Sequence, residues 1–460
     1  MSASSHYDVV IIGAGLAGLA AGIRCAQFFK RVLIVEAHSK LGGLNSYYHK
    51  HSREHLFSNG LHTVTNFNPV HRRWGASMVT RNLGISFEEL QVYPAKFPSR
   101  VSFPGLELTF DNDPRTLEAS VAALFPSQID GYKRLVAAVL EESARPDASM
   151  ENCFEFVAQF ITVPELRDAL ALPVLSYGGY REGAIDSRMF AILFRSLLIE
   201  GCGSPVDMKV FLERLHARFE ALGGELARRT TVERIVVHDG GVGAVVLSDG
   251  RELTAGAVMS SAGLTETGRL CGQTWGQPGT ISVFQWIGVY DRPLEELGVC
   301  DTLRFVCRTP KLDWHIPGDR MFTNVVTYSV SDNYQFPQPV KPHLKVSLFS
   351  KATEWLGLDD AAYEARKAEY VREVLRLTHE DYPSLAGTTA VVDDSFTPLT
   401  VEHYTRHPGG TIYGGVEKTF DGRTPIKNLT IIGNDQGGIG IMGAMTSGIL
   451  VSNFNVVLSK

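Results

Sequence analysis

The sequence has only six cysteines in 460 residues, and none of them forms the C-x-x-C spacing of a zinc site or redox pair. The N-terminus has no apolar stretch typical of a signal peptide. We therefore expect reduced thiols in a cytoplasmic protein, with neither a disulfide framework nor a bound metal. The formal net charge of −6 gives no support to nucleic-acid binding.

The chain also has little that could cross a membrane. Residues 436–459 form an uncharged run of 24 residues, but five glycines interrupt it, and Asn453 and Asn455 lie near its end. This composition suits a buried helix better than a helix that faces lipid. The length of the whole chain corresponds to about three domains, enough for a large core and a long cofactor.

The first forty residues carry the strongest pattern. Residues 7–12 are apolar and β-branched, as in a buried parallel strand, and they lead directly into the glycine turn Gly13-Ala14-Gly15-Leu16-Ala17-Gly18. Gly13 permits the tight turn, Gly15 lets the backbone approach a diphosphate, and Gly18 lets the following helix lie close to the strand. A second strand ends in Glu36, 23 residues after Gly13, where a carboxylate can accept hydrogen bonds from ribose hydroxyls.

A glycine pair, Gly42-Gly43, follows this unit. Together with the preceding strand, turn and helix, the pair resembles the FAD fingerprint of the flavoprotein superfamily that contains amine oxidases and carotenoid desaturases. The resemblance implies FAD rather than NAD, because simple nicotinamide dehydrogenases lack the pair. Leu44 stands where many members have arginine, so no guanidinium is expected at the phosphates.

Two later segments resemble further parts of the same superfamily. A hairpin over residues 230–247 resembles the segment in which a backbone position like Val232 contacts adenine. Near the C-terminus, a strand ends in Gly433-Asn434-Asp435, where the superfamily has an acidic residue that binds a ribityl hydroxyl.

A second G-x-G-x-x-G motif, residues 438–443, lacks both the directly preceding strand and the later acidic residue of an NAD site. We interpret it as the start of a helix whose positive end faces the flavin ring. The resemblance thus implies cofactor contacts at the following residues: Gly13, Gly15, Leu16, Ala17, Gly18, Glu36, Gly42, Gly43, Leu44, Val232, Gly433, Asp435, Gly440, Ile441 and Met442.

The motifs at 397–400 (T-P-x-T) and 410–414 (G-x-x-Y-G) resemble those of the group that holds phytoene desaturases, carotenoid isomerases and retinol saturases. That resemblance implies desaturation of a long apolar isoprenoid substrate by hydride transfer to flavin N5, with reversible contact to the inner face of a membrane. His62 matches a family turn near the flavin and is the one candidate for catalysis; the alternative is a histidine bonded to backbone. Other functions left open are saturation, redox-neutral isomerisation, amine oxidation (with Lys345 and Tyr413) and non-enzymatic carriage of prenylated proteins.

The predicted fold is α/β: a Rossmann-like FAD-binding domain of the glutathione reductase type and a discontinuous α+β substrate domain with a mixed sheet and a helical region. The FAD-binding domain is predicted to comprise residues 1–66, 201–275 and 385–460. Helical periodicity dominates 67–200, and strands dominate 276–384. Within the helical region, 189–199 is apolar nearly all round and predicts either a core helix or the wall of a tunnel that opens toward a membrane.

Overall fold

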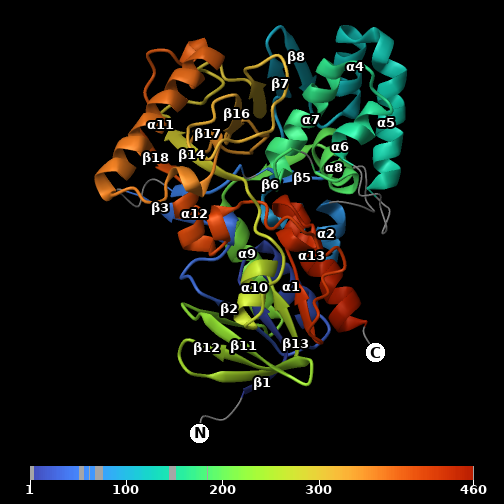
Figure 1. Cartoon of the computed structure of the whole chain (residues 1–460), viewed down its shortest axis with the longest axis vertical. Coiled ribbons are helices and arrows are strands. Elements are labelled where there is room, and N and C mark those ends of the chain that lie inside the picture. Colours follow the sequence, from blue (N-terminus) through green and yellow to red (C-terminus); the bar gives the residue numbers. More distant parts are fainter. Residues whose placement is uncertain are drawn as a thin grey trace.

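The structure is a computed structural model that describes residues 5–50, 56–61, 63–67, 76–143, 152–183 and 185–458. Two lobes are visible in Figure 1. The lower lobe holds both ends of the described chain and a seven-stranded sheet, and the upper lobe holds a second seven-stranded sheet flanked by helices. The predicted combination of a Rossmann-like domain with a mixed-sheet substrate domain is confirmed.

The lower sheet has the strand order β10-β2-β1-β13-β12-β11, with β19 paired to β13. Its parallel strands are β1 (Ser5–Ile12), β2 (Val32–Glu36), β10 (Glu225–Arg228), β13 (Glu252–Ser260) and β19 (Leu429–Ile431). β11 (Val232–His238) and β12 (Gly241–Leu247) form the antiparallel hairpin that the sequence predicted. All five residues of β2 are buried, as expected for a strand covered on both faces.

The helices of the lower lobe pack on this sheet and on one another. They are α1 (Leu16–Ala26), α9 (Met208–Ala221), α10 (Leu264–Leu270) and α13 (Gly440–Ser452). α1 and α13 approach closely, because a Cβ on Gly448 would lie 2.3 Å from the carbonyl oxygen of Ala17. Within the described residues, Gly440–Val457 is the one helical segment with the length and mean hydropathy (1.3) of a membrane span. Its packing against α1 is that of a core helix.

The upper sheet has the order β18-β14-β17-β16-β15-β7-β8. Its strands are β7 (Ser99–Phe103), β8 (Leu106–Phe110), β14 (Ser282–Val289), β15 (Leu303–Cys307), β16 (Val325–Val330), β17 (His343–Ser350) and β18 (Val392–Phe396). The sheet is mixed, since β15 pairs with β7 in parallel and the other neighbours are antiparallel. Helix α11 (Asp360–Asp381) packs on its outer side through Tyr370 and Val374.

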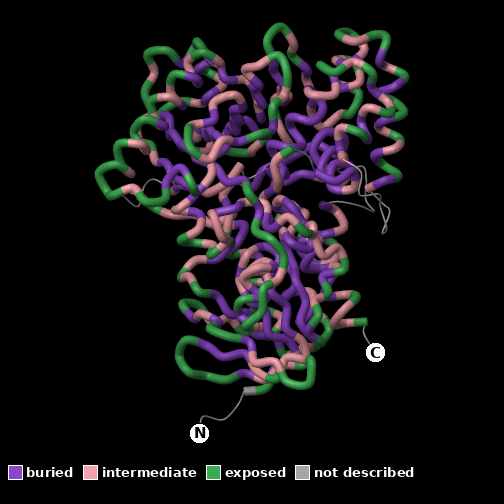
Figure 2. Tube along the Cα trace, in the orientation of Figure 1, coloured by how far each residue is buried: buried purple, intermediate pink, exposed green. Residues whose placement is uncertain are grey.

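Helices make up most of the rest of the upper lobe. These are α4 (Pro114–Leu124), α5 (Ile129–Glu142), α6 (Cys153–Ala158), α7 (Pro164–Gly178) and α8 (Ser187–Phe194), the last continued by a π-helical turn, η3 (Arg195–Ile199). Residues 189–199 are buried in the largest core cluster except Ile192 and Arg195, which are partly buried (Figure 2). This burial is that of a core helix, and the segment presents no exposed apolar surface to a membrane.

Short elements join the lobes. Strands β3 (Tyr47–His49) and β4 (Leu56–Ser58) form an antiparallel pair after the glycine pair. β5 (Val64–Thr65), β6 (Val92–Pro94) and β9 (Cys202–Pro205) form a three-stranded sheet. The remaining α-helices are α2 (Ala76–Leu83), α3 (Phe87–Leu90) and α12 (Pro398–Thr405).

Strand membership differs from the predicted domain ranges at two places. β7 and β8 lie within 67–200, where helical periodicity dominates, yet they form a hairpin that extends the upper sheet. The dipeptide Pro104-Gly105 between them is a turn signal that the helical prediction overlooked. β18 falls within 385–460 but is an edge strand of the same upper sheet.

Candidate cofactor and substrate cavity

A cavity of about 920 Å³ is lined by residues of both lobes. From the lower lobe it receives the carboxyl ends of β1, β2, β13 and β19, and from the upper lobe it receives side chains of β14, β16 and β17. Ligands of open parallel sheets bind at this edge of the strands. Of the predicted cofactor residues, all line the cavity except Gly18 and Met442.

The first glycine turn has the geometry of a phosphate site. A Cβ on Gly18 would lie 2.0 Å from the carbonyl oxygen of Gly13, so Gly18 serves helix packing and not ligand contact. A Cβ on Gly15, in contrast, would meet nothing within 4 Å. Helix α1 has no side-chain cap and no acidic residue in its first turn, and Leu16 and Ala17 line the cavity. Its N-terminal amides are therefore suited to a diphosphate, as FAD requires.

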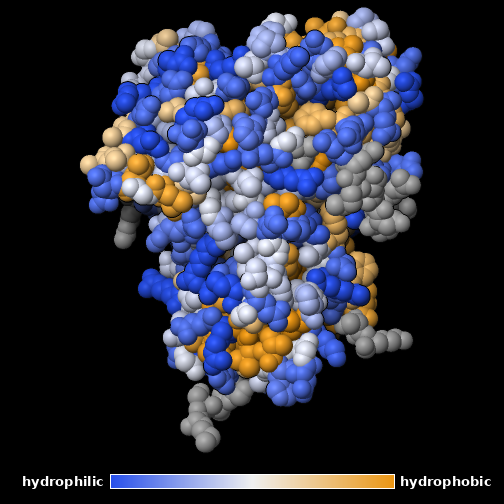
Figure 3. Space-filling view, viewed as in Figure 1, coloured by the Kyte–Doolittle hydropathy of each residue, from blue (hydrophilic) through white to orange (hydrophobic). Residues whose placement is uncertain are grey.

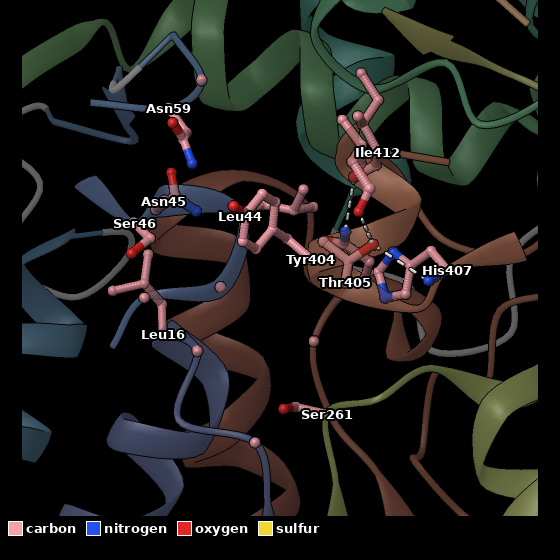
Figure 4. A pocket seen from close by; sticks show the side chains of 18 of the residues that line it. Leu16, Leu44, Asn45, Ser46, Asn59, Ser261, Tyr404, Thr405, His407 and Ile412 are labelled. Atoms are coloured by element: carbon pink, nitrogen blue, oxygen red, sulfur yellow. Dashed lines mark hydrogen bonds between the residues drawn. The ribbon is translucent and has the colours of Figure 1, made fainter. Parts of the chain in front are cut away.

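The glycine pair lies directly beside this turn. Gly42 donates its backbone N–H to the carbonyl of Ala14 at 3.0 Å, and a Cβ on Gly43 would lie 3.7 Å from the Cα of Gly15. The first glycine turn and the glycine pair thus form one wall of the cavity, and at their glycines this wall is backbone without side chains. In Figure 4, Leu16 and Leu44 lie on this side of the pocket, and Ile412 and His407 lie on the opposite side.

Glu36 lies at the end of β2 and is 7% exposed. Its Oε2 accepts a hydrogen bond from the amide of Ala14 at 2.7 Å, and its Oε1 accepts one from the amide of His38 at 2.8 Å. These two bonds fix the carboxylate while each oxygen keeps acceptor capacity for ribose hydroxyls. Val232 lies close by, since the preceding Thr230 donates its amide to the carbonyl of Glu36 at 3.0 Å.

Asp435 is held in a similar way farther along the cavity. It is 4% exposed, and its two carboxylate oxygens accept from the amides of Leu264 and Gly415, each at 2.6 Å. Gly414 has φ +78°, and a Cβ there would lie 2.0 Å from Asp435 Oδ1. Gly414 is the last glycine of the G-x-x-Y-G motif, and any other residue there would collide with this carboxylate. Burial lowers the pKa of the neighbouring Lys418 to about 8, although Asp435 opposes that shift.

The N-terminus of α13 opens into the same cavity. Gly440 and Ile441 line it, whereas Met442 is fully buried in the lower core. No side chain caps this helix, and its first turn has no acidic residue. A Cβ on Gly440 would lie 2.3 Å from the hydroxyl of Tyr177, whose pKa burial raises to about 12. The free positive end of α13 suits the negative charge of a reduced flavin.

His62 lies outside the described residues, so its placement stays a prediction. The residues on either side of it, Leu61 and Thr63, line the cavity. Lys345 holds the segment that precedes residue 62, because it donates to the carbonyl of Gly60 at 2.8 Å and to Ser58 Oγ at 3.1 Å.

Sequence reasoning missed two groups of cavity residues. One is the end of α12 and the loop after it, namely Tyr404, Thr405, Arg406 and His407. Figure 4 shows Tyr404, Thr405 and His407 on one side of the pocket. The T-P-x-T motif marks its start, because Thr397 is the N-cap of α12 in a capping box with Thr400. The other is a set of polar residues on the upper sheet, Gln285, Thr327 and Ser347. The large aromatic residues Trp286, Trp314, Tyr328 and Trp355 of the upper lobe are buried in the core and do not line the cavity.

Comparison with known proteins agrees with this geometry. Residues 16–453 match the sequence pattern of the family described as flavin containing amine oxidoreductase. The pattern spans nearly the whole chain, and the FAD expected from the sequence is the cofactor class of that family.

Several named relatives are similar to the chain at low identity. A phytoene desaturase (lycopene-forming) from a Paracoccus species is 27% identical over 280 residues, which cover 55% of this chain and 54% of the relative. The chain thus spans about half the length of the phytoene desaturases that it matches. An all-trans-retinol 13,14-reductase from Homo sapiens is 24% identical and covers 97% of this chain and 85% of the relative. A prolycopene isomerase from Daucus carota is 23% identical, with coverages of 98% and 80%.

Solved structures share the fold over the full chain. An oxidoreductase from Methanosarcina mazei has a TM-score of 0.64 at 17% identity and covers 97% of this chain and 99% of its own. Putrescine oxidase bound to putrescine also has a TM-score of 0.64, at 16% identity, with coverages of 98% and 99%. At these identities the likeness concerns the fold.

Proposed function

The chain belongs to the family of flavin-containing amine oxidoreductases and is an FAD-dependent oxidoreductase; we propose that it desaturates carbon–carbon bonds of a long apolar isoprenoid. The observation that carries this proposal is the set of relatives. Phytoene desaturases, retinol 13,14-reductases and a prolycopene isomerase are all named for polyene substrates. In support, the upper end of the cavity has apolar side chains from two strands and a loop, Val283, Phe349 and Ile412.

When bound, FAD would supply the hydride acceptor, flavin N5. The chain's own residues would hold and orient it: Glu36 at the ribose of the adenosine half, Gly15 and Gly43 at the diphosphate, and Asp435 at the ribityl chain. The N-terminus of α13 would stabilise negative charge at the reduced ring. Burial raises the pKa of Tyr177 to about 12 and also raises that of Tyr413, so neither phenol loses its proton near neutral pH. The main contribution of the protein is then positioning of the substrate and exclusion of water.

Saturation is the second candidate, and a specific observation favours it. The retinol 13,14-reductase from Homo sapiens matches 97% of this chain, whereas the phytoene desaturases match little more than half. The prolycopene isomerase matches 98%, so the same observation also favours isomerisation. The same site would then transfer hydride in the opposite direction, and isomerisation would involve no net transfer. Analysis of the product distinguishes the three reactions.

Amine oxidation is less well supported by the site. Lys345, the lysine considered for that role, does not line the cavity and instead donates to Gly60 and Ser58. Tyr413 does line it, but its hydroxyl donates to the carbonyl of Ser176 at 2.7 Å. The polar groups of both residues considered for amine oxidation are therefore already engaged by other parts of the protein.

Reversible membrane contact is part of the proposal, because a long isoprenoid is dissolved in the bilayer. Residues 189–199, the apolar segment considered as a tunnel wall open to a membrane, are buried, so another surface has to provide the contact. Apolar side chains gather at several separate places on the face shown in Figure 3. Tyr404 is 59% exposed and also lines the cavity, which makes the end of α12 our candidate for this contact.

The test starts from the purified protein. Denaturation should release stoichiometric, non-covalent FAD. Under anaerobic conditions a polyene substrate in liposomes should reduce the flavin, or the reduced flavin should be oxidised by it, and mass spectrometry should find a product changed by two hydrogens. If amines such as putrescine reduce the flavin and no polyene reacts, amine oxidation replaces this proposal.

A further inference from the structure

The upper wall of the cavity contains a row of three polar side chains. Strands β14, β17 and β16 are neighbours, and their register places both Gln285 and Thr327 directly opposite Ser347. All three residues line the cavity, although they are only 2%, 2% and 5% exposed. Such directly paired positions point to the same face of a sheet, so their side chains lie next to one another.

This polar row is incompletely bonded within the protein. Gln285 Nε2 donates to Ser347 Oγ at 2.9 Å. Neither Gln285 Oε1 nor Thr327 Oγ1 has a hydrogen-bond partner among the described residues. Exchange of the amide oxygen and nitrogen of Gln285 would leave its other polar atom unpaired instead, so either orientation lacks one partner. Buried polar atoms of this kind normally have a partner, and the open side of the row is the cavity.

The rows on either side behave differently. On one side, Lys345 and Ser329 bond to backbone carbonyls of the segment before residue 62, at Gly60 (2.8 Å) and Leu61 (3.0 Å). On the other side the row is apolar, with Val283 opposite Phe349. The row with the unpaired atoms therefore lies between two others. The side chains of one bond to the backbone at Gly60 and Leu61, and the side chains of the other are apolar.

We propose that this row, Gln285-Ser347-Thr327, is a subsite for a hydroxyl group of the substrate. A hydroxyl donates to one neighbour and accepts from another, so it satisfies Gln285 Oε1 and Thr327 Oγ1 together. A pure hydrocarbon leaves both atoms unpaired. The inference rests on the proposed function and narrows its substrate to an isoprenoid or polyene alcohol, whose apolar part lies toward Val283 and Phe349.

A site that bonds a hydroxyl discriminates strongly against the analogue that lacks it. The experiment compares all-trans-retinol with the hydrocarbon of the same skeleton, for the wild type and for Gln285→Leu and Thr327→Val. The wild type should bind and convert the alcohol at least tenfold better, and each variant should lose most of that preference. Ser329→Ala is the matched control, because its hydroxyl lies on the same strand but already has a protein partner. The control should keep the preference.

Three readouts make the result decisive. The melting temperature shows whether each variant is folded, the flavin content shows whether the cofactor still binds, and the change in flavin absorbance on titration gives ligand affinity without turnover. Equal affinity of the wild type for alcohol and hydrocarbon overturns the subsite, as does a variant that weakens both equally. A loss of flavin in Gln285→Leu and Thr327→Val would assign the row to the cofactor and also overturn it. If neither compound perturbs the flavin while a different class of substrate does, the proposed function fails instead.

Discussion

Lys418 Nζ lies 3.8 Å from Asp435 Oδ1, and the two side chains are only 2% and 5% exposed. Lys418 also donates to the carbonyl of Tyr413 at 2.7 Å and lies over the ring of Tyr180. The carboxylate that we assign to the ribityl chain is thus one half of a buried ion pair. Removal of this carboxylate therefore affects cofactor binding and also leaves the ammonium of Lys418 without its counter-charge.

We predict that Asp435→Asn loses FAD and is destabilised by about 3–5 kcal/mol, the usual cost of breaking a buried pair at one end. The double variant Asp435→Asn, Lys418→Met should recover most of that stability but not the FAD affinity. Urea unfolding and FAD titration of the apoproteins measure the two effects separately. Equal stability of the single and double variants would show that the pair is not coupled.

The two glycines of the first turn should respond differently to alanine. In Gly15→Ala the new methyl group enters open cavity space, so the apoprotein should melt as the wild type does while FAD binding is largely lost. In Gly18→Ala the methyl group collides with the carbonyl of Gly13, so the fold itself should be destabilised. Melting temperatures of the apoproteins, together with FAD titrations, test the contrast. A destabilised Gly15→Ala apoprotein would argue against an open phosphate site.

Much of the lower lobe was predictable because its signals are local. The strand, glycine turn and helix that end at Glu36 follow one another within about thirty residues, and each step has a backbone reason. Asp435 could be assigned only by resemblance. Its contacts with Leu264 and Gly415 join segments that are far apart in the sequence, and no periodicity reveals such bonds.

The substrate side was predicted less well for the same reason. Gln285, Ser347 and Thr327 come from three strands and become neighbours only through strand register. In the sequence each looks like an isolated polar residue in an apolar strand. β7 and β8 were missed because long helices surround them, and residues 189–199 could be assigned to core or membrane only once their neighbours were known.

Lys345 should make stability depend on pH. Burial lowers its pKa to about 7 in the folded protein, while in the unfolded chain it returns to 10.5. Between these values the unfolded chain binds more protons, so its contribution to the free energy of unfolding rises with pH from about 7 to about 10.5. Lys345→Met should remove up to about 3 kcal/mol of this rise between pH 7 and pH 9.5, as measured by urea unfolding. An unchanged slope would mean that Lys345 stays charged when buried; Lys418→Met is the comparison, since its pKa of about 8 predicts a rise that begins at higher pH and is smaller in total.

Glu36 should govern affinity for the adenosine half of FAD specifically. In Glu36→Gln one of the two backbone amides, Ala14 or His38, faces an NH₂ group instead of an oxygen, and the ribose loses a charged acceptor. A loss of about 1–3 kcal/mol corresponds to roughly five- to 150-fold weaker FAD binding. Binding of FMN, which has no adenosine, should stay nearly unchanged, so the preference for FAD over FMN should fall by the same factor. Glu225→Gln is the control, because that carboxylate is exposed on the neighbouring strand and pairs with Arg31. If Glu36→Gln weakens FAD and FMN equally, or leaves the FAD affinity at the wild-type value, the carboxylate does not bind the ribose.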